Sequence, residues 1–524
     1  ILACYGYLMM LWFRDSRVPQ ALIPKIHAEV RKRVKFDNEK WKRFDEILRD
    51  TYLTEHLLLK ENHDRELSFP SLKMTEFIAA VWLARHCDES VQTELQPWSG
   101  NEQWSNVWKL VAEMPETTTD NGNSVSDHNS LEHALHALFS VPAAGQTRPT
   151  EMMFRAWQVL TRNPTLATVR ASVLDRWRAQ FRSILVEGVV DGQPTDRARS
   201  AGEVVHRDDL KALVEQALDE QLDLRKPRLE FLQTQRNRNR AQNRELDLLE
   251  KEHEVISNLK AEHWCELIAP AEPAYCLCSD QVNGGDPNRL SFWMGASPQD
   301  SGATDREKPW QEIPIASFHM AATCVTRAQY RLFDSQREHQ HGGFSEYAPD
   351  GDCPMIYVNF HDGICFALWL GDAYCLPSEV EWEGAAWGGI NRAEHPDYVI
   401  GVPPYTRDFD SRHVNFDGNY PITGKKTEYR EHTVGVRYAE FTSNGFGLWQ
   451  MSGNVWEYCR SEWYDTLQQA IDGRNADLAV GTADGVRCVR GGSWFNGATG
   501  TRCSYRYWND DRDDTAGFRL SRTK

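Results

Sequence analysis

The sequence predicts an α+β protein in which an all-helical N-terminal region precedes a domain of short helices, strands and turns. Apolar residues recur at helical spacing through much of residues 1–264. Near Pro270 this periodicity gives way to Gly, Pro, Trp and turn signals, which continue to the C-terminus. We therefore expect helical regions at 1–115 and 116–264 and a mixed domain at 265–524.

Composition narrows the class of protein. The 524 residues exceed one ordinary hydrophobic core, so we expect several domains. The chain is 41% hydrophobic and 26% charged, as soluble globular proteins are. Its formal net charge is −17, whereas binding to phosphates requires clustered Lys and Arg. We therefore do not expect a nucleic-acid partner.

The chain opens on the apolar run ILACYGYLMMLWF. This run is too short to span a bilayer, and it lacks the basic start and small-residue cleavage site of a signal peptide. We expect a buried helix or strand, no membrane span, and a chain that is the C-terminal part of a longer protein.

The twelve cysteines form no CxxC pair, and Cys276 and Cys278 form a CxC without a second pair at zinc-ligand spacing. Without a secretory signal, we expect mostly buried thiols in a reducing cytoplasm. One or two disulfides in the C-terminal domain are the alternative.

In the first helical region, the clearest helix is expected within Ser68–Cys87. Phe77, Val81 and Trp82 recur there at helical spacing, and Thr75 is placed to cap the helix. The EF and AA pairs of this segment resemble the helical segment that follows the nucleotide-binding module in NACHT-type STAND NTPases. The chain has no GxxxxGKS/T motif, so the resemblance implies an ATPase module upstream of this sequence.

The second region is expected to start with a polar loop at 116–130 and to continue as helices. His133 and His136 lie three residues apart, and no third metal ligand is evident. This favours two surface or hydrogen-bonded core histidines over a metal site. An apolar stripe starting at Leu210 is expected to end at Pro227. The charged stretch that follows is interpreted as a spacer helix or helical hairpin that supports self-association. Its basic run QRNRNRAQNR is short and followed by acidic residues, which favours a solvated helix over a nucleic-acid contact.

The C-terminal domain contains a series of phrases in a fixed order. They are FWMGASPQD (292–300), CVTRAQYRLF (324–333), HDGICFALWLG (361–371), LPSEVEWEGAAWGG (376–389), GFGLWQMSGNVWEYC (445–459), VRGGSW (489–494) and GFRL (517–520). The second and third predict short amphipathic helices, and Ser378 with Glu381 predicts a capping box before another helix. We expect Trp382, Trp387, Trp449 and Trp456 to pack in the core rather than take part in chemistry.

The order and spacing of these phrases resemble the formylglycine-generating-enzyme, or sulfatase-modifying-factor, family. The resemblance implies a variant of the C-type lectin fold for residues 265–524. Oxidising members of this family use two Cys just after the Gly-Gly-Ser turn to bind copper and convert a substrate Cys to formylglycine. Here Asn496 stands at the first position, and Cys503 does not align with the second.

These departures argue against catalysis. Copper(I) needs soft thiolate ligands, so we expect no oxidase activity and no required cofactor. The related sulfoxide-synthase branch uses a His-rich iron site, and no matching His/Glu triad is found in this sequence.

The stretch 489–524 resembles the variable proteins of diversity-generating retroelements more closely. In those proteins, which share the lectin-type fold, an RGGSW turn precedes a surface rich in Asn-derived substitutions and a closing GFR. The resemblance implies that Arg502, Arg506 and Arg512 are fixed scaffold. The implied ligand-binding residues are Phe495, Asn496, Gly497, Ser504, Tyr505, Tyr507, Trp508, Asn509, Asp510, Asp511, Asp513, Asp514 and Thr515.

The ligand at this surface is expected to be an unidentified protein or other macromolecule. Tyr and Trp provide large rigid contact areas in wet, polar interfaces, so we expect Phe495, Tyr505, Tyr507 and Trp508 to be the anchors. The Asp cluster at 510–514 favours a basic partner, with a solvated loop as the alternative.

The family also carries structural calcium sites. Matched by motif, one site comprises Gln450, Gly453, Val455 and Glu457, and another comprises Asn415, Phe416 and Glu428. Gln450 departs from the usual Asn or Asp.

Three functions follow from this reading. The preferred one is a non-catalytic receptor or sensor with a hypervariable binding surface, at the C-terminal end of a STAND-type signalling protein. The alternatives are a formylglycine-generating or other metal-dependent oxidoreductase, and a sensor of the same fold with fixed specificity.

Overall fold

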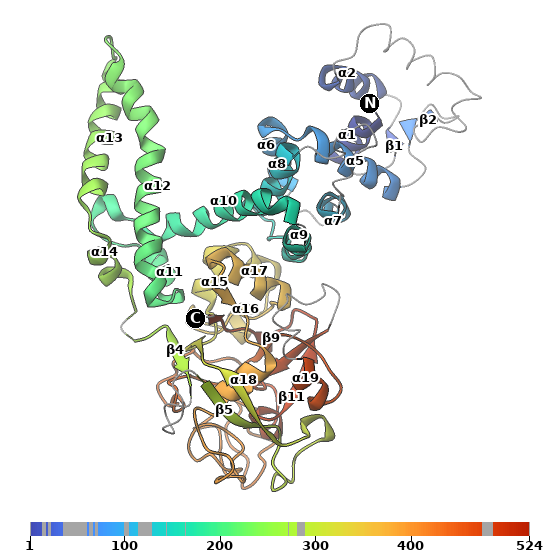
Figure 1. The fold of residues 1–524 in the computed structure, drawn as a ribbon, viewed down its shortest axis with the longest axis vertical. Coiled ribbons are helices and arrows are strands. Elements are labelled where there is room, and N and C mark those ends of the chain that lie inside the picture. Colours follow the sequence, from blue (N-terminus) through green and yellow to red (C-terminus); the bar gives the residue numbers. More distant parts are fainter. Residues whose placement is uncertain are drawn as a thin grey trace. The chain divides into compact units, whose positions relative to one another are not determined.

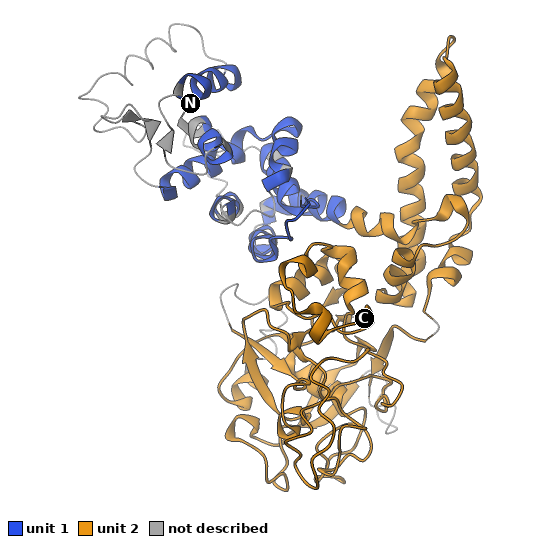
Figure 2. Ribbon diagram, turned by 180° about the vertical axis from the view of Figure 1, so that it is seen from behind, with its two compact units in different colours: residues 1–177 blue, residues 178–524 orange. Residues whose placement is uncertain are grey.

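The computed structural model describes residues 2–12, 17–18, 22–34, 60–61, 67–68, 72–98, 104–113, 128–142, 144–162, 164–270, 272–279, 289–473 and 486–522. The chain separates into two compact units, residues 1–177 and 178–524 (Figure 2). The boundary expected near residue 265 falls inside the second unit. Residues 116–127 of the expected polar loop lie outside the described residues.

The first unit is mainly helical (Figure 1). Its α-helices are α1 (Leu2–Trp12), α2 (Ile23–Arg33), α5 (Leu72–His86), α6 (Glu89–Leu95), α7 (Ser105–Glu113), α8 (His128–Phe139) and α9 (Thr150–Arg162). The short elements are η2 (Gln96–Trp98), η4 (Pro164–Leu166) and the strands β1 (Arg17–Val18), β2 (Lys60–Glu61) and β3 (Leu67–Ser68), which pair in the order β1-β3-β2.

The N-terminal apolar run forms α1, a buried helix, as one of the two expected alternatives. Leu8 and Met9 are fully buried, and the Tyr7 ring stacks on Trp82 of α5 at 4.3 Å between centroids. Helix α5 differs from expectation at its start. It begins at Leu72, so Thr75 lies within the helix and is buried rather than capping it.

The buried face of α5 is the predicted one only in part, because Trp82 is buried as expected. Phe77 is 45% exposed, while Ala79, Ala80 and Leu83 are fully buried. Because α1 and α7 both pack against α5, small side chains at its centre allow close approach of the neighbouring helices. Helical spacing alone did not indicate that the small alanines, rather than Phe77, would occupy the centre of this interface.

His133 and His136 behave as a satisfied pair. The Nδ1 atom of His133 lies 2.9 Å from the Gln92 side-chain oxygen, and Nε2 of His136 lies 3.3 Å from a Glu132 oxygen. Burial lowers the pKa of His136 to about 4, so its imidazole is neutral near pH 7. In the part of the chain that is described, no helix is long and apolar enough to cross a membrane.

The second unit opens with helices. Helix α10 (Ala167–Leu185) begins in the first unit and ends in the second, and it is followed by η5 (Val189–Asp191), α11 (Asp196–Val204), α12 (Arg207–Thr234), α13 (Arg240–Asn258) and α14 (Ala261–Ile268). Helices α12 and α13 lie side by side as a long hairpin in both ribbon views (Figures 1 and 2). The helical hairpin expected from the sequence is therefore present.

Pro227 does not end α12, contrary to the sequence prediction, because it lies inside a continuous helix. Proline removes one backbone donor from the helical ladder, but packing against α13 offsets that loss. Leu229 and Leu232 of α12 form a small apolar core with Leu246 of α13. Tertiary contacts thus override a local helix-breaking signal.

The remainder of the second unit is the mixed domain. Its helices are η7 (Asp305–Glu307), α15 (Arg327–Phe333), η8 (Arg337–Gln340), α16 (Phe344–Tyr347), α17 (Phe360–Leu370), α18 (Glu379–Ala386), α19 (Leu467–Gly473) and η10 (Ala498–Thr501). Its strands are β4 (Tyr275–Cys278), β5 (Arg289–Met294), β6 (Gln311–Ala316), β7 (Phe318–Ala321), β8 (Tyr374–Cys375), β9 (Trp456–Glu462), β10 (Arg487–Arg490), β11 (Arg506–Asn509), β12 (Ala516–Gly517) and β13 (Ser521–Arg522).

Long-range strand pairing closes this domain. One sheet has the order β4-β7-β13-β8, so the first and last strands of the domain both pair with β7. A second sheet has the order β11-β10-β9-β12, and β5 pairs with β6. Trp382 and Trp387 are buried in the core between these elements, as predicted.

Local capping signals in the domain are confirmed. The Ser378 hydroxyl accepts a hydrogen bond from the Glu381 amide, and the Glu381 carboxylate accepts one from the Ser378 amide. This capping box starts α18 at the predicted position. All twelve cysteines are free thiols.

The start of α12 is tied to the last strand of the domain. The Asp209 carboxylate accepts hydrogen bonds from Nη2 of Arg522 at 2.6 Å and from the Tyr374 hydroxyl at 2.6 Å. The Tyr374 hydroxyl in turn accepts one from the His206 amide at 3.0 Å. These contacts fix the base of the helical hairpin to strands β8 and β13.

We expect Asp209→Asn to loosen this junction, because Arg522 then loses its charged partner at a half-buried site. The loss should be about 1–3 kcal/mol and should appear as faster amide hydrogen exchange in the first turns of α12. Asp208→Asn is the matched control, since the Asp208 side chain is 76% exposed. Equal exchange in both variants would contradict the assignment.

Candidate functional site: the C-terminal surface

Strand β11 lies at one edge of the sheet β11-β10-β9-β12 in the described part of the chain. It pairs antiparallel with β10, so that Tyr507 lies opposite Val489 and Trp508 opposite Cys488. An edge strand has a strand neighbour on one side only. The segment 489–522 therefore presents β11 and its flanking loops at the border of the domain.

The turn before this surface needs glycine. Gly491 and Gly492 have φ of +94° and +73°, and a Cβ atom on Gly492 would lie 2.6 Å from the Gly500 carbonyl oxygen. Side chains are strained at such φ values. The Gly-Gly-Ser turn thus lets the chain fold back closely on residues 498–501.

Arginines of this segment bond to carboxylates from earlier parts of the domain; we call them the clamp arginines. The pairs are Arg490 with Glu383, Arg502 with Asp300 and Glu307, Arg506 with Glu379, Arg512 with Asp362, and Arg519 with Glu457. All of these side chains are buried except that of Arg512, which is about one-third exposed (32%). The clamp arginines include all three that the resemblance implied as scaffold.

The geometry of the clamps is that of strong charged hydrogen bonds. Nε and Nη2 of Arg506 donate to the two Glu379 oxygens, each at 2.7 Å. Burial alone would raise the pKa of Glu379, but Arg506 and Arg490 outweigh it and hold that pKa below its usual value. The carboxylate is therefore ionised in the interior, and its charge is matched by a bidentate guanidinium.

Sequence analysis missed the partners of the clamp arginines. Glu379 and Glu383 lie four residues apart in α18 and so share one face of the helix. This spacing within the EVEWEG phrase was the available signal. Asp300, Glu307 and Asp362 lie far from the C-terminal segment in sequence, and nothing local to them predicts their partners.

Exposed aromatic side chains lie between the clamps. Phe495 is 61% exposed, Tyr507 42% and Trp508 39%. The Tyr507 ring stacks on Trp508 at 5.8 Å between centroids, with the planes 11° apart, and also on Trp456 at 5.8 Å. Tyr505 is half-buried. The predicted aromatic anchors thus lie at the surface to different degrees.

Several residues predicted to contact a ligand instead make contacts within the domain. Ser504 is 2% exposed and donates to Glu307 at 2.9 Å, so it lies in the interior rather than on the surface. The Asn496 side chain accepts hydrogen bonds from the Ser493 amide and hydroxyl. Gly497 packs against Tyr420, where an added Cβ would lie 2.8 Å from the Tyr420 Cβ.

The loop after β11 is organised by its own polar side chains. Asp513 accepts hydrogen bonds from the Thr515 amide and hydroxyl, each at 2.8 Å, and from the Asn509 side chain at 2.9 Å. Burial and the neighbouring Asp513 raise the pKa of Asp514. Asp510 and Asp511 are exposed and form the acidic part of the surface.

The residues relevant to copper chemistry do not form a thiolate pair. Asn496, at the first family position, is held in the turn described above. Cys503 is fully buried, and burial raises the pKa of its thiol to about 11. Its Sγ lies 3.8 Å from the Ser452 hydroxyl. The buried thiol therefore remains protonated near neutral pH.

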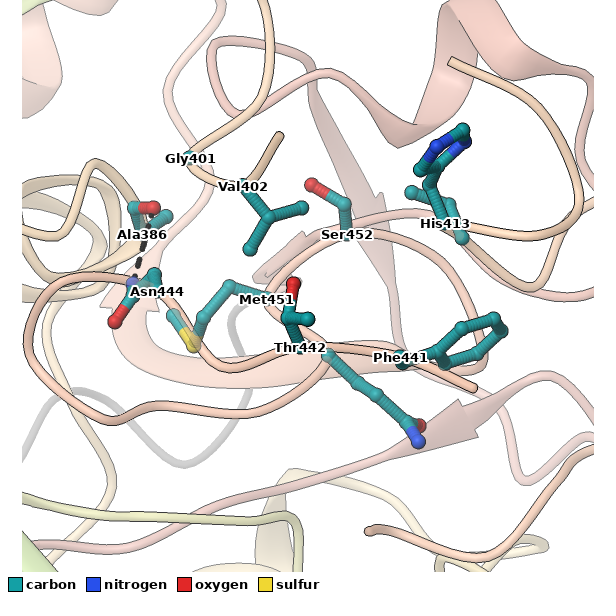
Figure 3. A pocket seen from close by; sticks show the side chains of 11 residues that line it. Ala386, Gly401, Val402, His413, Phe441, Thr442, Asn444, Met451 and Ser452 are labelled. Atoms are coloured by element: carbon teal, nitrogen blue, oxygen red, sulfur yellow. Dashed lines mark hydrogen bonds between the residues drawn. The ribbon is translucent and has the colours of Figure 1, made fainter. Parts of the chain in front are cut away.

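Ser452, whose hydroxyl lies near Cys503, also lines a small cavity (Figure 3). Ala386, Gly401, Met451 and Ser452 are among its lining residues, and its volume is about 10 Å³. That volume holds about one water molecule.

The residues implied for calcium binding are engaged in other contacts. Glu457 accepts hydrogen bonds from Arg519 at 2.6 and 2.7 Å and from the Trp382 indole at 2.6 Å. The Gln450 amide donates to the Gly435 carbonyl at 2.8 Å. A calcium ion at the first site would therefore share Glu457 with a buried guanidinium.

At the second implied site, Asn415 pairs with Gly453 in an isolated β-bridge, which joins the two motif segments. The Asn415 side chain donates to the His432 carbonyl at 2.9 Å. Phe416 is fully buried, and Glu428 is 62% exposed and paired with Arg430. Calcium binding at both sites stays a prediction.

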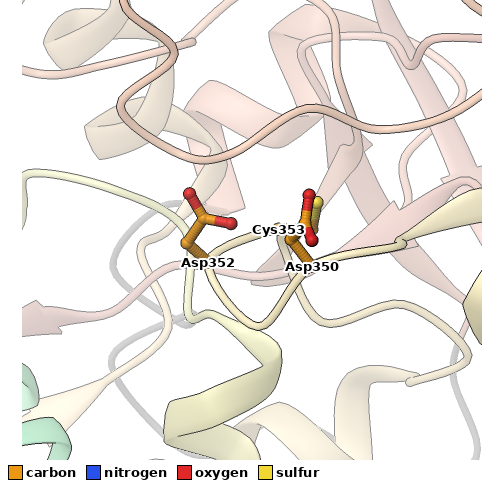
Figure 4. Close-up of side chains that lie close together, drawn as sticks. All are labelled: Asp350, Asp352 and Cys353. Carbon is orange, nitrogen blue, oxygen red and sulfur yellow. The ribbon is translucent and has the colours of Figure 1, made fainter.

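Two further features lie away from the C-terminal surface. Among the described residues, one group of metal-ligand side chains gathers, with the ligand atoms of Asp350, Asp352 and Cys353 within 4.8 Å of one another (Figure 4). The two aspartates are exposed, and burial raises the pKa of Cys353. Asp352 also lines a cavity of about 470 Å³ together with Glu203 and Arg437.

The C-terminal region matches a known family. Residues 287–524 match the model of the Sulfatase-modifying factor enzyme 1-like domain, so this region of the chain carries a domain of that kind. The family resemblance predicted for this region is confirmed. The resemblance of residues 68–87 to NACHT-type proteins stays a prediction.

The curated proteins similar to this chain include formylglycine-generating enzymes and protein kinases. The formylglycine-generating enzyme of Thermomonospora curvata is 33% identical over 148 residues, which cover 27% of this chain and 45% of the enzyme. The serine/threonine-protein kinase pkn1 of Chlamydia caviae is 26% identical over 238 residues, covering 41% of this chain and 34% of the kinase. The chain thus spans less than half the length of each. Among solved structures, Treponema denticola variable protein 1 aligns with a TM-score of 0.32 at 18% identity, covering 45% of this chain and 95% of that one.

We expect Arg506→Ala to destabilise the second unit strongly, because it removes the bidentate partner of the buried Glu379 carboxylate and leaves only Arg490, whose Nε lies 3.8 Å away. The cost should be about 3–5 kcal/mol, measured by urea unfolding followed by Trp fluorescence. Arg412→Ala is the control, since Arg412 pairs with Asp410 at 2.6 Å but is 78% exposed, and should cost less than about 1 kcal/mol. Similar small losses in both variants would show that the clamp is not structural.

Proposed function

We propose that the segment 489–522 is a non-catalytic binding surface for a protein or other macromolecular ligand. The observation that carries this proposal is the separation of roles along the segment. The clamp arginines are bonded to carboxylates of the domain, whereas Phe495, Tyr507, Trp508, Asp510 and Asp511 are exposed. The residues that hold the segment in place are therefore different from those that face solvent.

This separation suits recognition. The clamps hold the backbone of the segment in place, so little conformational entropy is lost when a ligand binds. Stacked Tyr507 and Trp508 offer a large, rigid, amphipathic contact area. Asp510 and Asp511 beside them favour a ligand with a basic surface, through complementary charge.

The same separation supports hypervariation on a C-type lectin-type fold. Replacing an exposed side chain such as Trp508 leaves every clamp intact, so many sequences at these positions are compatible with one backbone. We therefore propose a variable surface of the diversity-generating-retroelement kind. The helical resemblance of residues 68–87 supports placing this domain at the C-terminal end of a STAND-type signalling protein.

Similarity to formylglycine-generating enzymes favours an oxidase function, and the 33% identity to that of Thermomonospora curvata is an example. The residue chemistry opposes it. Copper(I) requires soft thiolates, and this chain has Asn496 in one expected position and a single buried, protonated thiol nearby.

Sequencing the locus across many isolates tests the variable surface. We expect substitutions to concentrate at the exposed positions Phe495, Tyr507, Trp508, Asp510 and Asp511. The five clamp arginines, the 490–494 turn and 517–519 should stay constant, because they hold the backbone. Uniformly low variation would favour a sensor of fixed specificity, and substitutions at the clamp arginines would contradict the division of roles.

A copper-dependent oxidation assay tests the enzyme alternative. The purified chain, loaded with copper(I) and offered a Cys-containing peptide in air, should produce no formylglycine. The Thermomonospora curvata enzyme is the positive control. Turnover by this chain, detected by peptide mass, would refute the non-catalytic function.

A further inference from the structure

A cavity of about 470 Å³ lies within the second unit. Its walls come from α11, the segment that precedes β4, α15, the turn at 351–352 and the segment at 436–437, which are distant in sequence. A cavity of this size is in the range of small-molecule sites. None of the clamp arginines lines it, so the cavity is separate from the C-terminal surface described above.

The charged groups that line this cavity do not balance. Three carboxylates line it, those of Glu203, Glu272 and Asp352, together with one guanidinium, that of Arg437. Arg437 already pairs with Glu272, and its guanidinium lies over the Trp449 ring, 5.7 Å from the centroid. Glu203 and Asp352 therefore have no ion-paired cation of their own among the described residues.

The carboxylates of Glu203 and Asp352 are available to a ligand. Both residues are exposed to solvent, and neither side chain accepts a hydrogen bond from a described residue. The Asp352 carboxylate lies against Gly435, where an added Cβ would overlap one of its oxygens. Burial raises the pKa of Glu203, and the attraction of Arg437 offsets only part of that rise. A cationic ligand in the cavity would stabilise the ionised form of both carboxylates.

Two buried hydrogen-bond donors line the same cavity. Gln329 is 8% exposed, and its side-chain oxygen accepts a hydrogen bond from the Thr326 amide at 3.0 Å in the capping box of α15. The Nε2 group of Gln329 donates to no described residue. The Thr326 hydroxyl accepts from the Gln329 amide at 3.2 Å and also donates to no described residue, although Thr326 is only 7% exposed. Because a buried donor without an acceptor is costly, these two groups favour a ligand that brings an acceptor.

The rest of the lining includes small apolar side chains. Pro270, Ala274, Ala328 and Val436 contribute to it. Such side chains suit a stretch of methylene groups, which gain free energy when they leave water. The cavity therefore combines unpaired carboxylates, unsatisfied donors and apolar surface.

We propose that this cavity binds a free basic α-amino acid of the lysine type. The two ammonium groups of such a ligand match the carboxylates of Glu203 and Asp352. Its carboxylate accepts hydrogen bonds from Nε2 of Gln329 and from the Thr326 hydroxyl, and its methylene chain contacts the apolar lining. This inference does not depend on the binding function proposed for residues 489–522.

Other classes of ligand satisfy fewer of these groups. A simple diamine brings two cations but no acceptor for Gln329. A dicarboxylate would meet two unpaired carboxylates and a guanidinium that is already paired with Glu272, so like charges would repel it. A metal ion held by Asp350 and Asp352 would leave Glu203 and Gln329 without partners.

Isothermal titration calorimetry of the intact chain with L-lysine tests the proposal. The wild-type chain should bind L-lysine. L-norleucine, which lacks the side-chain ammonium, and 1,5-diaminopentane, which lacks the carboxylate, should each bind at least about tenfold more weakly, because each loses charged hydrogen bonds. Absence of binding to L-lysine, or equal affinity for all three compounds, would overturn the proposal.

Substitutions in the cavity test which groups meet the ligand. Glu203→Gln and Asp352→Asn should each weaken L-lysine binding about tenfold. Asp350→Asn is the matched control, because Asp350 is an exposed aspartate on the same turn that does not line the cavity (Figure 4). Circular dichroism of each variant confirms that its fold is retained. Equal affinities in the cavity variants and the control would overturn the proposal.

Gln329→Glu tests the acceptor. This variant keeps the side-chain oxygen that caps α15 but replaces the Nε2 donor by a second oxygen. It should weaken binding of L-lysine, whose carboxylate then meets a carboxylate, and leave binding of 1,5-diaminopentane at least as strong as in the wild-type chain. An equal loss for both compounds would contradict the role assigned to Gln329.

Discussion

Buried pairs between arginine and carboxylate are the interaction on which the C-terminal domain depends. Each clamp joins residues that are distant in sequence: Arg506 of β11 to Glu379 of α18, and Arg519 near the end of the chain to Glu457 of β9. Removing two charges from water is costly, so such a pair is stable only when both partners and their geometry are in place. The main effect of the clamps is therefore to fix where the last segment lies on the domain. Their net contribution to the free energy of unfolding is smaller.

This constraint explains how one segment can be both rigid and exposed. Strand β11 places Arg506 inside and Tyr507 and Trp508 outside, so the same four residues anchor the backbone and present an aromatic surface. The remaining backbone freedom is reduced by the Gly491–Gly492 turn and by the polar contacts of Asp513. The segment is thus held by buried contacts, and the solvent-facing side chains contribute little to holding it.

The same packing engages the residues at positions where the family resemblance implies metals. Glu457 neutralises a buried guanidinium, and Cys503 is a buried thiol whose Sγ lies 3.8 Å from the Ser452 hydroxyl. Asn496, at the position of the first family cysteine, serves as a hydrogen-bond acceptor within the turn. Each of these three residues therefore makes a contact within the fold at a position that the family resemblance singles out.

The sequence alone determined several local features: the capping box of Ser378 and Glu381, the short helices α15 and α17, and the family resemblance of the C-terminal region. It left two alternatives each for the buried N-terminal run and for the charged stretch after Pro227, which the structure shows as a helix and as part of a helical hairpin. The local features depend on periodicity and on contacts within a few residues, which a sequence displays directly. Tertiary structure decided which side chains of the segment 489–522 are exposed. Ser504 is interior because Glu307 lies beside it, α12 continues through Pro227 because α13 packs against it, and Thr75 lies within α5 rather than capping it. Each of these outcomes depends on a partner brought close only by folding, and the sequence near the residue carries no sign of it.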